Sequence, residues 1–147
     1  MTFPERQLSF RVLWSDQDLL DVEASVAFAG WAGAERAYAA RSDLTAFADS
    51  LDRVAEGGSE AELTLGQPSL GYARCRVFEY GGPRHLAMDI VVGCGAGGTG
   101  RRADHGRETR LSVPIERGQL SAFATSIRTI ARDERGIAVL PFPPDWP

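Results

Sequence analysis

The chain of 147 residues contains no lysine and no asparagine, and it has two cysteines and two histidines. Without lysine, the phosphate-binding loop Gly-x-x-x-x-Gly-Lys of P-loop proteins is excluded. Two cysteines make no disulfide framework in a chain this long, and a reducing compartment would keep Cys75 and Cys94 as thiols. The N-terminus lacks a basic segment followed by an apolar run, and no apolar stretch approaches the roughly 20 residues of a membrane span. We therefore expect a soluble cytoplasmic protein.

The charges that are present are unevenly distributed. Residues 1–66 carry 12 acidic residues against 5 arginines, a net charge of −7, whereas residues 67–147 carry 8 against 11, a net charge of +3. Phosphate binding depends on clustered positive charge, so an acidic first half argues against a nucleic-acid partner. A basic protein partner fits this distribution better.

Most of the chain alternates between apolar and polar residues, which is typical of half-buried strands. Residues 8–14 place Leu8, Phe10 and Val12 on one face, and residues 20–28 place every second side chain in the same way. Residues 34–41 are ambiguous between a strand and a helical turn. Further strands are expected at residues 61–65, 72–80, 85–92, 109–113 and 135–140. The turn Gly81-Gly82-Pro83 favours an antiparallel hairpin.

Two amphipathic helices are predicted at residues 44–55 and 120–131, which are identical at six of twelve positions. In each, apolar residues recur every three or four positions. Ser42 is the expected N-cap of the first helix, with Asp43 in its first turn, and Gly57-Gly58 is the expected stop. The offset of 76 residues is about half the chain and suggests an internal pseudo-repeat, arising from duplication or from convergence on the same packing.

These elements predict a single α+β domain over residues 1–147. We expect a largely antiparallel sheet of about six to seven strands, in one layer or two, with the two helices packed against it. Residues 93–107 are predicted to form a flexible loop rich in glycine and arginine, and residues 141–147 a proline-rich tail. The tail contains Pro141-x-x-Pro144, a candidate polyproline ligand, but an arm docked through Phe142 or Trp146 is favoured.

Several motifs are candidates for chemistry, but none predicts a catalytic, cofactor or metal site. Gly93-Cys-Gly-Ala-Gly-Gly98 matches the dinucleotide fingerprint formally, but the sequence after it has no helical apolar stripe to receive a pyrophosphate. The cysteines, together with His85 and His105, lack the paired short spacings of a structural zinc site. No Gly-x-Ser-x-Gly elbow is present, and a Ser-His-Asp triad would need one of these two histidines. We therefore expect no cofactor and no catalytic residues.

The residues that remain as binding candidates are acidic or aromatic. Asp16, Asp18, Asp21 and Glu23 could pair carboxylates, although an exposed face of an antiparallel sheet explains them more simply. Trp31 between glycines is a candidate for a binding surface. The predicted partner-binding residues are Asp16, Asp18, Trp31, Asp49, Asp52 and Glu56.

A family resemblance runs through nearly the whole chain. It is carried, in order, by Trp14-Ser-Asp-Gln-Asp-Leu-Leu-Asp-Val-Glu-Ala-Ser-Val26, Phe28-Ala-Gly30, Tyr38, the helix with Leu44, Phe47 and Leu51, Glu60-Ala-Glu-Leu63, His85-Leu-Ala-Met-Asp-Ile90 and the helix from Leu120. In this order the chain resembles the bacterial immunity proteins typified by WapI, the antidote to a wall-associated contact-dependent toxin. The resemblance implies a small cytosolic α+β protein, without catalysis or cofactor, that binds and silences a toxin domain.

We therefore expect a non-enzymatic protein-binding module, with an immunity protein as its specific form and a basic toxin domain as its partner. The first alternative is a small-molecule-binding protein or hydrolase with a pocket bounded by Asp16, Asp18, Trp31 and residues 93–107. The second is a homo-oligomeric structural protein, such as a homodimer, that pairs through an exposed edge strand.

Overall fold

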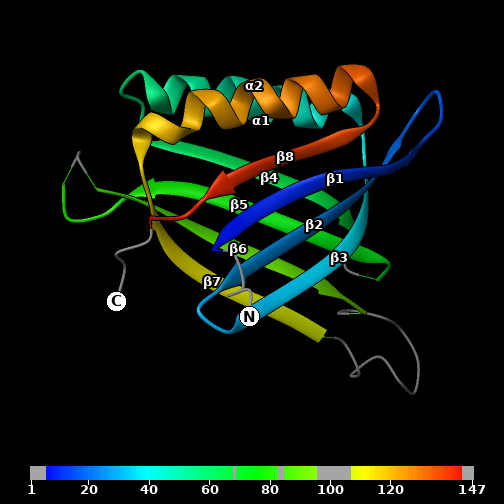
Figure 1. Cartoon of the computed structure of the whole chain (residues 1–147), viewed down its shortest axis with the longest axis horizontal. Helices are drawn as coiled ribbons and strands as arrows, with labels where there is room; N and C mark the ends of the chain where they lie inside the picture. Colours follow the sequence, from blue (N-terminus) through cyan, green and yellow to red (C-terminus); the bar gives the residue numbers. More distant parts are fainter. Residues whose placement is uncertain (1–5, 68, 83–84, 96–106, 144–147) are drawn as a thin grey trace, which may run out of the picture.

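Strands and two helices make up most of the chain in the computed structural model, which describes residues 6–67, 69–82, 85–95 and 107–143 (Figure 1). The elements are β1 (Gln7–Ser15), β2 (Leu20–Phe28), β3 (Trp31–Ala39), α1 (Arg41–Ala55), β4 (Glu60–Gln67), β5 (Gly71–Glu79), β6 (Leu86–Cys94), β7 (Arg107–Ile115), the short 3₁₀ helix η1 (Arg117–Gln119), α2 (Leu120–Asp133) and β8 (Gly136–Pro141). The predicted α+β class is confirmed. The described ranges contain eight strands in two sheets, against the expected six to seven.

Each sheet has four antiparallel strands, and the two halves of the chain exchange one strand. The sheet orders are β3-β2-β1-β8 and β4-β5-β6-β7. The strand that follows α1 therefore joins the sheet of the second half, and the strand that follows α2 returns to β1, where Gln7 lies opposite Pro141. α1 therefore carries the chain from the first sheet to the second, and α2 carries it back.

One hydrophobic core lies between the sheets and the helices. The face predicted from alternation in β1 is confirmed, because Leu8, Phe10 and Val12 are buried. Phe142 is also buried, with its ring centroid 6.1 Å from that of Phe28, so the predicted docking of the chain after β8 is confirmed for this residue. Trp146 and residues 96–106 lie outside the described ranges.

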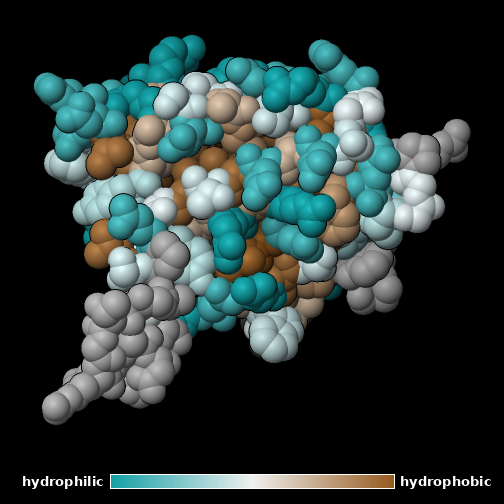
Figure 2. Space-filling model, turned by 180° about the vertical axis from the view of Figure 1, so that it is seen from behind, coloured by the Kyte–Doolittle hydropathy of each residue, from teal (hydrophilic) through white to brown (hydrophobic). Residues whose placement is uncertain are grey.

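The two helices lie side by side along one edge of the molecule, where α1 contacts β4 and α2 contacts β8 (Figure 1). The predicted apolar stripe of α1 is buried, at Leu44, Phe47, Leu51 and Val54. Seen from behind, the same edge is mainly hydrophilic, while hydrophobic side chains gather near the centre of that face (Figure 2). The helices are therefore amphipathic as predicted, with their apolar stripes turned to the core.

The start of α1 differs from the prediction. The helix begins at Arg41, and its N-cap is Ala40, whose backbone is extended, so Ser42 lies inside the first turn and does not cap it. The ambiguous segment is strand as far as Ala39, and the chain enters the helix directly from that strand. Asp43 is in the first turn as expected, where its charge complements the helix dipole.

Two arginines connect the ends of the helices reciprocally. Arg41 contacts the carboxylate of Glu134, just after α2, and donates to the carbonyl of Asp16 at 2.6 Å. Arg117, just before α2, donates to the carbonyl of Gly58 at 3.1 Å and to that of Val54. The side chains of Arg41 and Arg117 are both 27% exposed. The start of each helical segment is thus held at the end of the other, and the helices run antiparallel.

Candidate functional site

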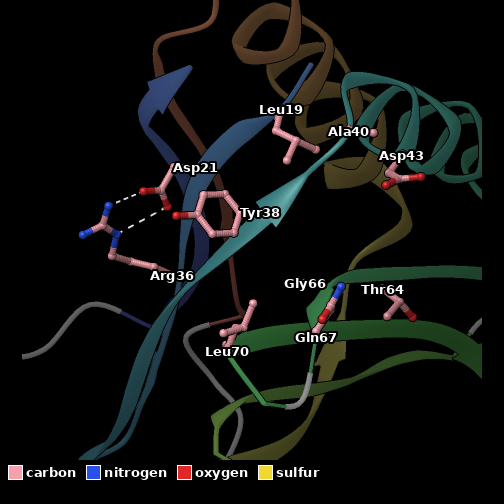
Figure 3. Close-up of a pocket in the computed structure, with 11 residues that line it drawn as sticks. Leu19, Asp21, Arg36, Tyr38, Ala40, Asp43, Thr64, Gly66, Gln67 and Leu70 are labelled. Atoms are coloured by element: carbon pink, nitrogen blue, oxygen red, sulfur yellow. Dashed lines mark hydrogen bonds and ion pairs between the residues drawn. The ribbon is translucent and has the colours of Figure 1, made fainter. Parts of the chain in front are cut away.

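A cleft of about 660 Å³ opens where β3 passes over the turn between β4 and β5, below the first turn of α1 (Figure 3). We call it the seam cleft, because its walls come from both sheets. Its lining residues are Leu19, Asp21, Arg36, Tyr38, Ala40, Asp43, Thr64, Gly66, Gln67, Leu70 and Gly71. It combines charged, polar and apolar side chains from four separate segments of the chain.

Two glycines allow the sheets to pack closely along this cleft. A Cβ atom on Gly71 would lie 2.2 Å from the carbonyl oxygen of Arg36 on β3. One on Gly66 would lie 2.9 Å from the Cβ atom of Ala37 on β3, and 2.0 Å from the carbonyl oxygen of Gly71 within its own sheet. Both glycines also have positive φ angles, +154° and +75°, which side chains disfavour. The close contact fixes β3 against the β4–β5 turn and so sets the spacing of the cleft walls.

An ion pair between a buried carboxylate and an exposed guanidinium forms one wall. Asp21 is 3% exposed, although the sequence pattern predicts an exposed sheet face at this position. Its carboxylate accepts hydrogen bonds from Nε of Arg36, at 3.3 Å, and from Nη2 of the same guanidinium. These hydrogen bonds and the charge of Asp21 raise the pKa of Arg36. Arg36 itself is largely exposed, so the pair lies at the cleft surface with its two charges mutually compensated.

Three exposed apolar side chains surround this pair. Leu19 is 39% exposed, Tyr38 50% and Leu70 65%. Figure 3 shows Leu19 and Leu70 on opposite sides of the cleft, with the Tyr38 ring beside Asp21. Large exposed side chains grouped around a hollow, with tyrosine and arginine among them, are typical of the central part of a binding interface.

Asp16 and Asp18 lie in the turn between β1 and β2, next to the cleft. The carboxylate of Asp16 accepts hydrogen bonds from the backbone N–H groups of Leu19, at 2.8 Å, and Asp18, at 2.7 Å, and these bonds lower the pKa of Asp16. Asp16 therefore holds the turn that presents Leu19 to the cleft. Trp31 is 67% exposed but lies at the other end of β3 from Tyr38, about 20 Å along the strand. The structure does not bring Trp31 to this turn.

The acidic residues predicted on the first helix do not line the cleft. Asp49 and Asp52 accept contacts from Nη2 of Arg128 on α2, at 2.6 and 2.5 Å. Glu56 is exposed at the C-terminal end of α1. The opposite charges of the two helices thus meet within the molecule, and part of the predicted acidic surface is neutralised.

The thiols and imidazoles are not gathered into one site within the described ranges. Cys75 is buried, and burial raises its pKa to about 12, which disfavours the thiolate that a metal needs. Cys94 ends β6 and donates to the carbonyl of Leu70 at 3.5 Å, and the His85 ring lies 5.6 Å from that of Tyr80. His105 lies outside the described residues, and no group of three potential metal ligands occurs among those that are described.

Sequence reasoning missed most of the cleft. Arg36 and Tyr38 lie in the segment left ambiguous between strand and helix, where buried Ala37 and Ala39 alternate with them. That alternation was the available signal, since it places the two polar residues on one face of a strand. The register then sets Tyr38 directly opposite Asp21.

Comparison of the chain with protein-family models, with curated proteins and with solved structures finds no match. The resemblance to WapI-type immunity proteins therefore stays a prediction. Among the described residues, neither helix has the length and hydropathy that crossing a bilayer requires. The seam cleft has to be interpreted from its own chemistry.

Proposed function

We propose that this protein is a non-enzymatic, cytoplasmic protein-binding module that docks its partner at the seam cleft. One observation carries the proposal: Leu19, Tyr38 and Leu70 are exposed together around the Asp21–Arg36 ion pair. Removing such side chains from water on binding is favourable, at about 25 cal/mol for each Å² of apolar surface. Tyrosine and arginine are also enriched among the residues that dominate binding energies.

The cleft is preorganised for such a role. The bidentate Asp21–Arg36 pair holds one wall, and the close packing at Gly66 and Gly71 holds the other. A surface that is already ordered loses less conformational entropy when a partner binds. A partner can therefore be held by a small number of anchoring side chains.

The specific form that we propose is an immunity protein that neutralises a bacterial toxin domain. The family resemblance and the net charge of −7 over residues 1–66 support it, since an acidic surface attracts a basic partner. The first test is genetic: a toxin gene should lie beside the gene for this protein. Co-expression with that toxin domain should restore growth, and the two chains should elute together in size-exclusion chromatography.

Variants then locate the interface. Tyr38→Ala and Leu70→Ala should each weaken the complex about tenfold or more, as expected for anchoring residues. Tyr80→Ala and Leu13→Ala are the control variants, because they remove the same types of side chain from exposed positions, 39% and 42% exposed, that do not line the cleft. If the control variants no longer protect cells from the toxin while the cleft variants still do, docking at the seam cleft is contradicted. Absence of any neighbouring toxin gene or copurifying partner would contradict the immunity function.

A small-molecule function is the second candidate, because about 660 Å³ falls within the usual range of ligand pockets. This pocket is the seam cleft and not the predicted one, since Trp31 does not contribute to it. A thermal-shift screen of metabolites would test it. A compound that raises the melting temperature of the native protein but not that of the Tyr38→Ala variant would favour ligand binding over protein docking.

A further inference from the structure

The charges that line the seam cleft are not balanced. Asp21 and Arg36 compensate each other through two hydrogen bonds, which leaves the carboxylate of Asp43 as the third charged group of the lining. Asp43 is exposed in the first turn of α1, and among the described residues its side chain has no hydrogen-bond or ion-pair partner. Among the described residues, the lining therefore carries one negative charge that has no cationic side chain paired with it.

Arg41, two residues before Asp43 in the chain, does not pair with it. The guanidinium of Arg41 is engaged by the carboxylate of Glu134 and by the backbone carbonyls of Asp16 and Gln17. The adjoining turn adds the exposed acids Asp16 and Asp18. The electrostatic environment at this end of the cleft is thus negative, which favours a positively charged occupant.

The remaining walls select the shape of that occupant. Leu19 and Leu70 offer aliphatic surface, and the half-exposed ring of Tyr38 offers an aromatic face. Contact with the leucines stabilises a bound aliphatic stem, and both the face of the ring and a carboxylate attract a cation. Lysine and arginine side chains combine a long apolar stem with a cationic head.

We propose that the seam cleft binds a lysine or arginine side chain that projects from the partner protein, with its stem between Leu19, Tyr38 and Leu70 and its charge at Asp43. This inference rests on the proposed docking function and names the chemistry of the docked group. An acidic side chain fits less well. Arg36 already donates through Nε and Nη2 to Asp21, and an anion would also face Asp43.

Capped amino acids test the proposal without knowledge of the partner. The full chain, labelled with nitrogen-15, is titrated with the N-acetyl, N-methylamide forms of arginine, lysine, norleucine and glutamate, and backbone amide shifts are recorded. The arginine and lysine probes should give saturable shifts at Leu19, Asp43 and Leu70. Norleucine, which has the stem without the charge, should bind about fivefold more weakly, and glutamate should give no saturable shift.

The charge is tested by Asp43→Asn, which should weaken the arginine and lysine probes about fivefold and leave norleucine unchanged. Glu116→Gln is the matched control, because Glu116 is an exposed acid outside the cleft lining. Any of three results refutes the cationic occupant. Glutamate binds as well as arginine, the Asp43→Asn variant binds arginine normally, or no probe at tens of millimolar shifts the backbone amide signals of the cleft residues. These outcomes leave docking intact as long as Tyr38→Ala still weakens the partner complex, whereas a partner complex insensitive to Tyr38→Ala and Leu70→Ala refutes the docking function itself.

Discussion

The first half of the chain, from β1 to β4, and the second, from β5 to β8, pass through the same order of elements and build equivalent sheets. The positions related by 76 residues share their burial in β3 and β7 and along both helices. The buried helix pairs are Leu44 and Leu120, Phe47 and Phe123, Leu51 and Ile127, and Val54 and Ile130. The two halves thus fill equivalent core positions with residues of similar size.

The halves differ where the seam cleft lies. The residues that correspond to Arg36, Tyr38 and Asp43 are Ser112, Pro114 and Gln119. In the same register Asp21 lies opposite Tyr38, and Ala87 lies opposite Pro114. The second half therefore folds without the ion pair, the exposed tyrosine or the free carboxylate. The topology does not require these groups, and this supports a binding role for them in the first half.

The largest expected effect tests the equivalence of the two cores. Phe47→Ala and Phe123→Ala each remove a ring that is 1% exposed, and each should lower the free energy of unfolding by about 3–5 kcal/mol. Urea denaturation of the two variants measures this directly. A difference of about 2 kcal/mol or more between the two variants would mean that the two halves of the core contribute unequally to stability.

The next effect contrasts the charged wall of the cleft with its counterpart. Arg36→Ala leaves the carboxylate of Asp21 buried without its partner and should lower the melting temperature by about 5 °C. Ser112→Ala removes a hydroxyl that donates to Asp89 at 2.7 Å on an exposed surface. This variant should change the melting temperature by about 1 °C or less. Equal melting temperatures for the two variants would show that the Asp21–Arg36 pair has no structural role.

A smaller and symmetrical effect is expected at the ends of the helices. Arg41→Ala and Arg117→Ala each remove hydrogen bonds to carbonyl groups from a guanidinium that is 27% exposed. Each should cost about 1–2 kcal/mol of stability. Hydrogen exchange should locate the loss, because the Arg117 variant should expose amides at the end of α1 and the Arg41 variant those around the β1–β2 turn. Exchange that rises uniformly over the whole chain in both variants would contradict this reciprocal arrangement.

The smallest effect lies on the surface between the helices. Asp52 and Arg128 occupy corresponding positions and contact each other at 2.5 Å. Because the pair is partly exposed to solvent, Arg128→Asp should cost about 0.5–1 kcal/mol, and the exchange Asp52→Arg with Arg128→Asp should recover most of that loss. Thermal unfolding at low and high salt provides the measurement. An exchange variant no more stable than the single variant would show that the attraction depends on Asp49 instead.

Local features of the fold could be predicted from the sequence, because they depend on periodicity within a few residues. The alternation in residues 20–28 matches β2, and the stripes of both helices are buried as predicted. The start of α1 was misplaced, because a well-suited cap at Ser42 is overridden by the direct entry from β3. The internal pseudo-repeat stays a prediction, since the residues shared by the two helices lie largely on their buried faces, where similar packing alone favours similar residues.

The exchange of β4 and β8 and the seam cleft could not be predicted, because both depend on contacts between distant segments. Nothing local to residues 136–141 specifies β1 as their partner. The burial of Asp21 likewise depends on Arg36, which follows after an intervening turn and lies within a different strand. The charge of Asp16 predicts a partner-binding residue, whereas in the structure its carboxylate organises the turn that carries Leu19.

The pairing of β1 with β8 also determines when the first sheet can be completed. β1 is synthesised before the six strands and two helices that separate it from its neighbour β8 among the described residues. Until β8 leaves the ribosome, one edge of β1 has no strand beside it, and unpaired edges are prone to join other chains. Contacts between such distant segments also slow folding. A growing chain of this protein therefore passes through a period of exposure to aggregation that lasts at least until β8 is added.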